Sequence, residues 1–114
     1  MSTEAEINIF KCLDFIRDNA APYAQAKANR VYLEEYRKSK KSLLMKQAEA
    51  NGHNAVRAQE REAYADAGYI QHLEGLKEAV ASEEELRWMM IAAQAKIEVW
   101  RTLESTRRVE AKTL

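Results

Sequence analysis

A long stretch from Tyr69 to about Lys112 carries no signal that would end a helix. It contains no Pro, and Gly75 is its only Gly. Both tryptophans, Trp88 and Trp100, lie within it. Because interior Pro and Gly weaken a helix more than any other residues, the stretch predicts one long helix around which the rest of the chain is arranged.

The apolar side chains of this helix fall into two groups on a helical wheel of about 100° per residue. With Leu73 at zero, one group lies at roughly 330° and the other at about 200°. The first group is Tyr69, Leu73, Leu76 and Val80, and the second is Leu86, Met89, Met90, Ala93, Ile97, Trp100 and Leu103. This change of direction predicts that the helix offers its first third to one partner and its last two thirds to another.

A helix boundary inside this stretch is an alternative at Ala81–Ser82. Ser82 and Glu85 have the spacing of a capping box, which marks the start of many helices. The helix either ends there or continues and changes partners. The absence of Gly and Pro at this point favours continuity, with or without a bend.

Three further helices are expected before the long one. Thr3 and Glu6 have capping-box spacing for a helix over about 3–19, and Pro22 suits the first position of a second helix over about 22–50. Asn51–Gly52 should end the second helix, since Gly accepts the left-handed backbone of a C-cap. Asn54 is expected to cap a short helix over about 55–64, and Asp66 to cap the long helix over about 68–110.

The fold predicted from these elements is all-α and forms a single domain over residues 1–114. The two long helices should form an antiparallel hairpin, with a short N-terminal helix packed on them and a short connecting helix between them. Leu33, Tyr36, Leu43 and Leu44 should supply the apolar contacts of the second helix. The polar residues 105–114 are expected to fray.

Composition excludes a membrane-spanning chain, because no apolar run approaches the roughly 18 residues that a bilayer requires. The N-terminus lacks the basic start and apolar core of a signal peptide. Cys12 is the only cysteine, so no intrachain disulfide can form, and we expect a small buried thiol. These features predict a cytoplasmic protein, in the host cell if the protein is viral.

Catalytic patterns are sparse. His53 lies in an expected loop and His72 on the long helix, without a second histidine or a cysteine at metal-ligand spacing. Phosphate-binding Gly loops and nucleophile elbows are absent. We therefore expect no catalytic residue, no metal and no cofactor, and the protein is predicted not to be an enzyme.

Charge is separated along the chain although the formal net charge is zero. Residues 27–46 hold seven basic and two acidic side chains, a balance of +5, and residues 74–85 hold five acidic and one basic, a balance of −4. The candidate nucleic-acid-binding residues are Arg30, Arg37, Lys38, Lys41 and Lys46. They would contact phosphates weakly and without sequence preference, with Tyr32 or Tyr36 for stacking. The alternative is a solvated face that pairs with the acidic start of the long helix, and this predicts that Tyr36 belongs to the core.

The run from Trp88 to Ala93 makes the long helix apolar around much of its circumference. Trp88 lies at roughly 60°, away from the main apolar group of its segment. One short and one long helix are too few to cover such a surface, so self-association is expected. The candidate residues are Trp88, Met89, Met90, Ile97 and Trp100.

Three segments resemble small all-helical proteins from the early regions of tailed phages, which are often encoded beside recombination or replication genes. The segments are Lys40–Met45, Gln59–Ala65 and Ala92–Arg101, and the resemblance covers residues 30–108. It implies a phage or prophage protein that assists DNA metabolism. It brings no catalytic residue.

The functional expectation is a non-enzymatic phage accessory protein that assists DNA recombination or replication. Its partners would be further copies of itself, a phage or host DNA-metabolism protein, and DNA bound weakly. The alternative is a structural or regulatory helical bundle that binds proteins and has no nucleic-acid role.

Overall fold

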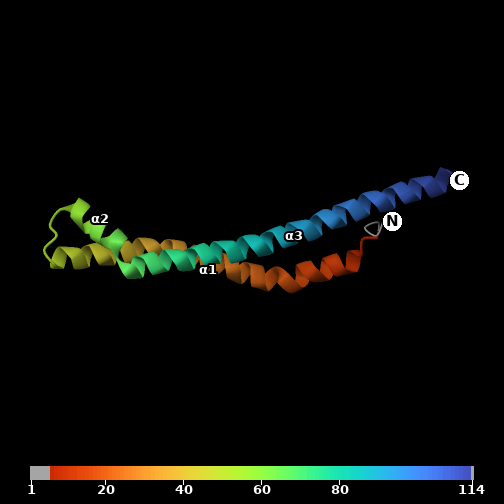
Figure 1. Ribbon diagram of the computed structural model, residues 1–114. Coiled ribbons are helices and arrows are strands. Elements are labelled where there is room, and N and C mark those ends of the chain that lie inside the picture. Colours follow the sequence, from red (N-terminus) through yellow and green to blue (C-terminus); the bar gives the residue numbers. More distant parts are fainter. Residues whose placement is uncertain (1–5, 114) are drawn as a thin grey trace. The chain divides into compact units, whose positions relative to one another are not determined.

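The computed structural model describes residues 6–113, and within that range the chain is all-α without a strand. Helix α1 spans Ile9–Ala50, α2 spans Val56–Ala65 and α3 spans Ala67–Thr113 (Figure 1). The all-α class is confirmed, and so are a long C-terminal helix and a short connecting helix. The number of helices is not, because one helix replaces the two expected before residue 50.

The predicted turn at Asn19–Pro22 is wrong, because α1 runs through Pro22. A Pro inside a helix removes one hydrogen bond and crowds the preceding turn. The buried residues Cys12 and Ala26 on either side of Pro22 show that α1 packs against a neighbour before and after it. This packing outweighs the local preference to stop.

The start of α1 is set by Asn8. Its side-chain Oδ1 accepts a hydrogen bond from the backbone N–H of Lys11 at 3.1 Å, as an N-cap does. Glu6 precedes the helix, and Thr3 lies outside the described residues. The capping box expected at Thr3 and Glu6 therefore does not start α1.

The end of α1 is confirmed at Asn51–Gly52. Gly52 has a φ of 103°, the left-handed region that favours glycine. Its N–H donates to the Glu49 carbonyl, and the His53 N–H donates to the Ala48 carbonyl, both at 3.0 Å. These two bonds form a Schellman motif, which satisfies the last carbonyls of the helix.

Of the cap predictions for α2 and α3, one is confirmed and one is wrong. Asp66 caps α3 as expected, since its Oδ2 accepts from the Tyr69 N–H at 3.1 Å. Asn54 does not cap α2, whose N-cap is Ala55 without a side-chain hydrogen bond. Helix α3 continues through Ser82, and it also continues through Thr113 where fraying was expected.

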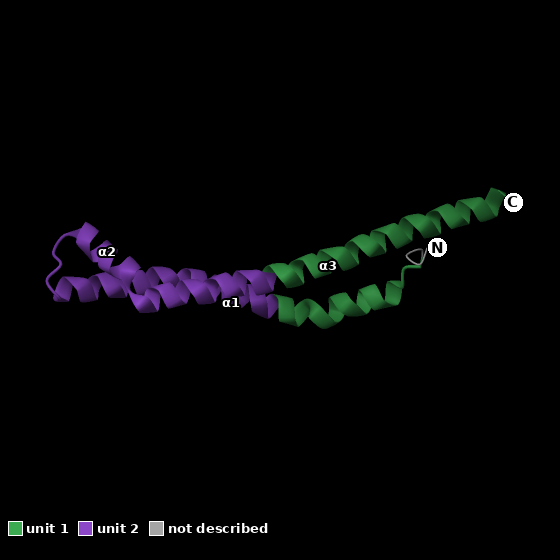
Figure 2. Cartoon of the chain, in the orientation of Figure 1, with its two compact units in different colours: residues 1–23, 84–114 green, residues 24–83 purple. Residues whose placement is uncertain are grey.

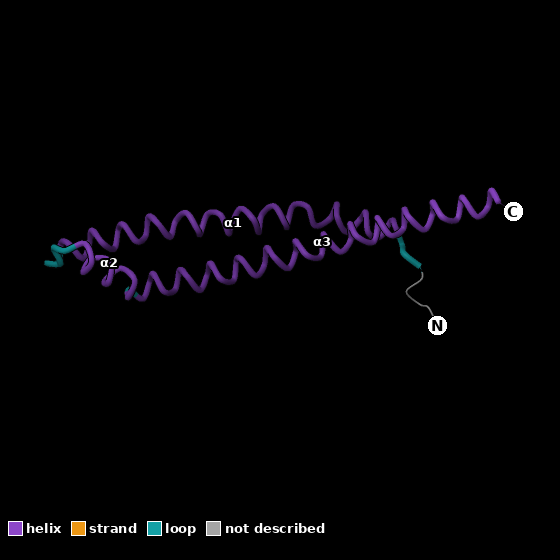
Figure 3. The backbone as a smooth tube through the Cα atoms, turned by 90° about the horizontal axis from the view of Figure 1, so that it is seen from above, coloured by secondary structure: helices purple, strands orange, loops and turns teal. Residues whose placement is uncertain are grey.

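The chain divides into two compact units, and each long helix contributes to both (Figure 2). Unit 1 comprises residues 1–23 and 84–114, and unit 2 comprises residues 24–83. In unit 2, Arg30 contacts Glu83 and Leu33 contacts His72, so higher numbers on α1 meet lower numbers on α3. These segments are therefore antiparallel, and the loop that ends α1 appears in Figure 3 beside α2.

The facing residues of unit 2 recur at alternating intervals of three and four. On α3 this series is Tyr69, His72, Leu76, Ala79 and Glu83, all buried or half-buried. On α1 it is Ala26, Arg30, Leu33, Arg37, Lys40 and Leu44. This spacing is that of two helices meeting along a heptad seam. The seam of unit 2 is unusual in holding several charged or polar side chains.

Unit 1 has the same spacing with a more apolar seam. On α3 the series is Leu86, Met90, Ala93, Ile97, Trp100 and Glu104, and on α1 it is Ile9, Cys12, Ile16, Asn19 and Tyr23. Cys12 and Ala93 are its most buried members. Cys12 is therefore the buried thiol that the sequence predicted.

Both apolar groups of α3 have members in a seam, and the seam partner is a different segment of α1 in each unit. A seam with a seven-residue repeat drifts about 20° per heptad on a wheel drawn at 100° per residue. Five heptads separate Tyr69 from Glu104, and the drift of roughly 100° accounts for most of the change in direction. Within each unit, the partner of α3 is a segment of α1.

The core is thin. Its buried apolar residues are Cys12, Ala26, Ala48, Ala63, Tyr69 and Ala93, and no large side chain described is fully buried. Tyr36 is 39% exposed and Leu43 is 58% exposed, so neither is the core residue that was expected. Much of the apolar surface therefore lies outside the seam.

Candidate interaction surfaces

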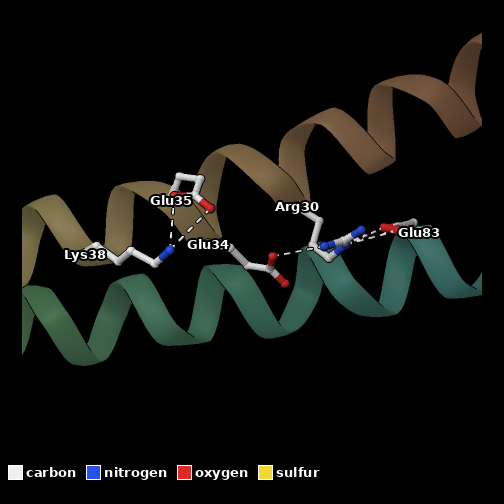
Figure 4. A network of polar contacts seen from close by, with 5 residues as sticks. All are labelled: Arg30, Glu34, Glu35, Lys38 and Glu83. Carbon is white, nitrogen blue, oxygen red and sulfur yellow. Dashed lines mark hydrogen bonds and ion pairs between the residues drawn. The ribbon is translucent and has the colours of Figure 1, made fainter.

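A charged pair lies inside the seam of unit 2. The Nε atom of Arg30 donates to Glu83 Oε2 at 2.6 Å and to Oε1 at 3.0 Å, and Nη1 donates to Glu34 Oε2 at 3.0 Å (Figure 4). The hydrogen bond to Glu83, followed by that to Glu34, raises the pKa of Arg30 above its ordinary value. The expected pairing of the basic helix with the acidic start of α3 is confirmed at Arg30 and Glu83.

A second basic side chain, that of Lys41, links α1 to α2. Lys41 Nζ lies 3.3 Å from Glu60 Oε2 and 4.9 Å from the centroid of the Tyr64 ring. Tyr64, followed by Glu60, raises the pKa of Lys41 above its ordinary value of 10.5. The short helix thus has polar as well as apolar attachments to α1.

His72 makes a further polar contact across the seam of unit 2. Its Nε2 lies 2.7 Å from the Leu33 carbonyl oxygen, which can only accept, so Nε2 carries the proton and donates. The Tyr36 ring lies against His72 with 5.6 Å between centroids, and Tyr32 stacks on Tyr36 at 6.0 Å. These contacts place an aromatic pair, Tyr32 and Tyr36, at the rim of the seam; we call it the aromatic ledge.

The candidate nucleic-acid residues do not form one free basic surface. Arg30 and Lys41 are held by the contacts described above. Lys38 Nζ lies 3.3 Å from Glu35 Oε2 on the same helix (Figure 4), and Arg37 is half-buried in the seam. Lys46 is exposed. Arg37, Lys38 and Lys46 are therefore the members that remain available for phosphate contact.

The candidate self-association residues divide into two sets. Met90, Ile97 and Trp100 are half-buried members of the seam of unit 1. Trp88 is 58% exposed and Met89 is 45% exposed, and the Arg87 guanidinium lies 5.0 Å from the Trp88 ring centroid. Trp88 and Met89 are the two that can reach another molecule without opening the seam.

An open groove of about 330 Å³ runs along one side of unit 1. Its residues are Lys11, Cys12, Phe15, Met89, Ala92, Ala93 and Lys96. The floor is apolar and two lysines flank it, so a peptide with an apolar face and nearby carboxylates would be complementary.

Sites for metal or proton chemistry are not assembled within residues 6–113. No group of three or more His, Cys, Asp or Glu side chains is placed there to hold a metal ion. His53 Nε2 and Glu62 Oε1 form an isolated pair at 3.9 Å. The same part of the chain contains no helix long and apolar enough to cross a membrane.

Sequence reasoning missed several residues that organise unit 2. Gln59 is buried and its Nε2 donates to the His53 carbonyl at 2.9 Å, which fixes the loop between α1 and α2. Glu83 was counted only as part of the acidic block and His72 was considered only as a metal ligand, although both lie in the seam. The three-four spacing of Tyr69, His72, Leu76, Ala79 and Glu83 is the signal that could have identified them.

The described residues therefore offer surfaces for contact and a polar seam that fixes how two segments meet. These features define what the molecule can bind without naming a ligand. Comparison with known proteins finds no matching family model, and no significant match among curated proteins or among solved structures.

Proposed function

We propose that this protein is a non-enzymatic interaction protein, built as a helical hairpin, that assists DNA recombination or replication in a phage or prophage. The observation that carries the interaction role is the exposure of large apolar side chains. Phe10 is 73% exposed, Tyr32 66%, Trp88 58% and Val99 51%. An exposed apolar surface, such as Trp88 and Met89 with the apolar groove that Met89 lines, is typical of a site that binds another protein.

The polar seam of unit 2 favours a role as a rigid scaffold. Arg30, Glu83 and His72 form hydrogen bonds that are satisfied only when α1 and α3 of unit 2 meet in one alignment. A scaffold needs such a fixed alignment so that its outer side chains keep constant positions. The link to DNA metabolism rests on the resemblance of residues 30–108 to phage early-region proteins.

The partner is expected to contact Trp88 and Met89. Both are large, exposed and adjacent to the apolar groove, which Met89 lines. Trp and Met are enriched at protein interfaces, since Trp buries a large area and the flexible Met side chain adapts to the shape of a partner. The direct alternative, a structural bundle without a nucleic-acid role, uses the same surface with a different partner.

Site-specific photocrosslinking tests this function. A photoreactive amino acid at Trp88, introduced in the native host cell, should capture a recombination or replication protein. The same probe at the exposed Arg57 of α2, in the other unit, is the control. Capture from Trp88 and not from Arg57 supports the proposal. Capture of proteins unconnected with DNA from Trp88 would favour the structural alternative.

A direct role in DNA binding has weaker support. The formal charge is zero, and Arg30 and Lys41 are held inside unit 2. Any DNA contact would rest on Arg37, Lys38 and Lys46 and would be weak and non-specific. We therefore place DNA binding second to protein binding.

A further inference from the structure

Gly75 lies inside helix α3, and no contact within the described chain requires a glycine at this position. Gly disfavours a helix interior relative to Ala, but it lets another group approach the helix backbone closely. A Cβ at residue 75 would meet nothing within 4 Å. A Cβ at Gly68, by contrast, would lie 2.9 Å from Asp66 Oδ2 and 3.3 Å from Lys40 Nζ. The chain itself accounts for Gly68 but leaves open space above Gly75.

The aromatic ledge lies on the same side of unit 2 as Gly75. Tyr36 packs on His72, and Gly75 follows His72 by three residues, which places the two on one face of α3. Tyr32 extends the ledge away from the seam and is 66% exposed. One face of unit 2 therefore carries a projecting aromatic ridge on α1 and an open position on α3.

We propose that a second copy of this chain docks on this face, with the Tyr32–Tyr36 ledge of each copy over Gly75 of the other. A two-fold interface requires a patch that is complementary to itself, and a ridge beside an open position meets that requirement. The missing side chain at Gly75 lets the partner's tyrosine rings approach the α3 backbone. Gly75 then has the packing reason that the single chain lacks.

The charges of the two helices agree with this arrangement. Placing the ledge of one copy over Gly75 of the other lays α1 of each copy along α3 of its partner. Of the basic residues in 27–46, the exposed Lys27, Lys38 and Lys46 can then face the acidic start of the partner's α3. Inside the chain, the pair Arg30 and Glu83 uses one charge from the basic segment and one from the acidic segment. Glu74 and Glu78 of unit 2 are exposed and can attract the partner's lysines.

The exposed area is sufficient for a stable dimer. The chain exposes 8702 Å², whereas a compact monomer of 13.1 kDa exposes about 6,400 Å². The excess of roughly 2,300 Å² exceeds the 800 Å² or so that each partner buries in an interface of standard size. The aromatic ledge and Gly75 belong to unit 2, whereas Trp88 and Met89 belong to unit 1. The proposed dimer goes beyond the proposed function, and it does not depend on the identity of the protein that binds at Trp88.

Sedimentation equilibrium on purified protein tests the dimer. The unmodified chain should be dimeric at micromolar concentrations. Gly75→Ala should weaken dimerisation about tenfold, which corresponds to about 1.4 kcal/mol, and Gly75→Leu should abolish it. Because Ala favours the helix more than Gly does and its Cβ would meet nothing within 4 Å, the dilute Gly75→Ala monomer should melt at a higher temperature than the unmodified one. A weaker dimer made from a more stable monomer is the signature of an interface glycine.

Two further variants keep the test specific. Tyr32→Gln removes the exposed end of the ledge and should weaken the dimer at least tenfold. Ala81→Leu adds a side chain at an exposed position of the same helix, away from Gly75, and should leave the dimer unchanged. A monomeric unmodified chain would overturn the dimer, as would a dimer that neither Gly75→Leu nor Tyr32→Gln weakens. A monomer that still captures a DNA-metabolism protein through Trp88 would leave the proposed function standing.

Discussion

Units 1 and 2 use the same two long helices but differ in what holds the helices together. In unit 2, Arg30 bonds Glu83 and His72 bonds the Leu33 carbonyl across the seam. In the described part of unit 1, each ion pair joins residues of a single helix, as Arg87 and Glu84 do. Polar contacts are satisfied in one alignment only, whereas apolar contacts tolerate small shifts. Unit 2 therefore specifies how the helices meet, and unit 1 mainly adds apolar area.

The contacts that hold each unit together agree with the surface that the unit offers to other molecules. Unit 2 needs a fixed geometry if its aromatic ledge is to meet an identical ledge on a second copy. Unit 1 presents Trp88, Met89 and an open apolar groove, features that adapt to partners of varied shape. The difference predicts that the two units respond differently to mutation.

The largest effect is expected from placing charge in the seam of unit 1. Met90→Glu with Ile97→Glu puts two carboxylates at half-buried apolar positions and should cost roughly 3 kcal/mol or more. Hydrogen exchange should then show that amides of residues 9–23 lose protection while those of residues 30–48 keep it. Met89→Glu with Val99→Glu is the matched control, since both side chains are exposed. Simultaneous loss of protection in both units would mean that they unfold as one.

A smaller effect should separate two adjacent leucines of unit 2. Leu44 is half-buried in the seam, and Leu44→Ala should lower the free energy of unfolding by about 2 kcal/mol, the lower end for leucines in cores. Leu43 is 58% exposed, and Leu43→Ala should change it by less than about 0.5 kcal/mol. Urea denaturation of both variants measures the difference. Equal destabilisation would show that the seam is not where the structure places it.

The sequence predicted most of the helical content but not the seam. Gly52 and Asp66 were identified because their roles are local: a left-handed backbone and a side chain that accepts from a nearby N–H. Pro22 misled the prediction because its local cost is real, and only packing on both sides of it reveals that α1 continues. Local signals thus predict helix ends well unless tertiary contacts oppose them.

The candidate site was predicted less well for a related reason. Basic residues were grouped by their position in the sequence, yet Arg30 belongs with Glu83, which is 53 residues away. Trp88 was separated from the main apolar group and is exposed, whereas Met90, Ile97 and Trp100 were named as self-association candidates and are half-buried in the seam. Composition identifies the apolar side chains that can bind another surface. Which of them are buried depends on where the neighbouring helix packs.

We expect nucleic-acid binding to be weak and to depend on the basic residues of unit 2. Arg37→Glu with Lys46→Glu should lower the affinity for labelled oligonucleotides at low salt by at least about tenfold, or about 1.4 kcal/mol. Each lost phosphate contact should reduce the slope of log affinity against log salt by about 0.7 to 0.9. Arg107→Glu with Arg108→Glu reverses two exposed charges of unit 1 and is the control. Fluorescence anisotropy measures all three proteins, and an absence of binding by the unmodified chain would exclude DNA as a ligand.

The smallest effect is expected at high pH and tests whether polar contacts stabilise unit 2 in particular. Tyr64 and Glu60 raise the pKa of Lys41 above 10.5, so the folded state holds this proton more tightly than the unfolded state does. The resulting stability is fully present below pH 10.5 and is lost as the pH rises through the folded-state pKa.

Because Lys41 is partly exposed, solvent screening should keep this contribution small. Urea denaturation at a series of alkaline pH values should show that Lys41→Met is less stable than the unmodified chain at neutral pH and loses less stability above pH 10.5. Arg17→Met in unit 1 is the control: the exposed Arg17 pairs with Asp14 and Asp18 and stays charged throughout this range. Parallel stability curves for the unmodified chain and Lys41→Met would show that this contact holds α1 and α2 together no more strongly than a surface ion pair does.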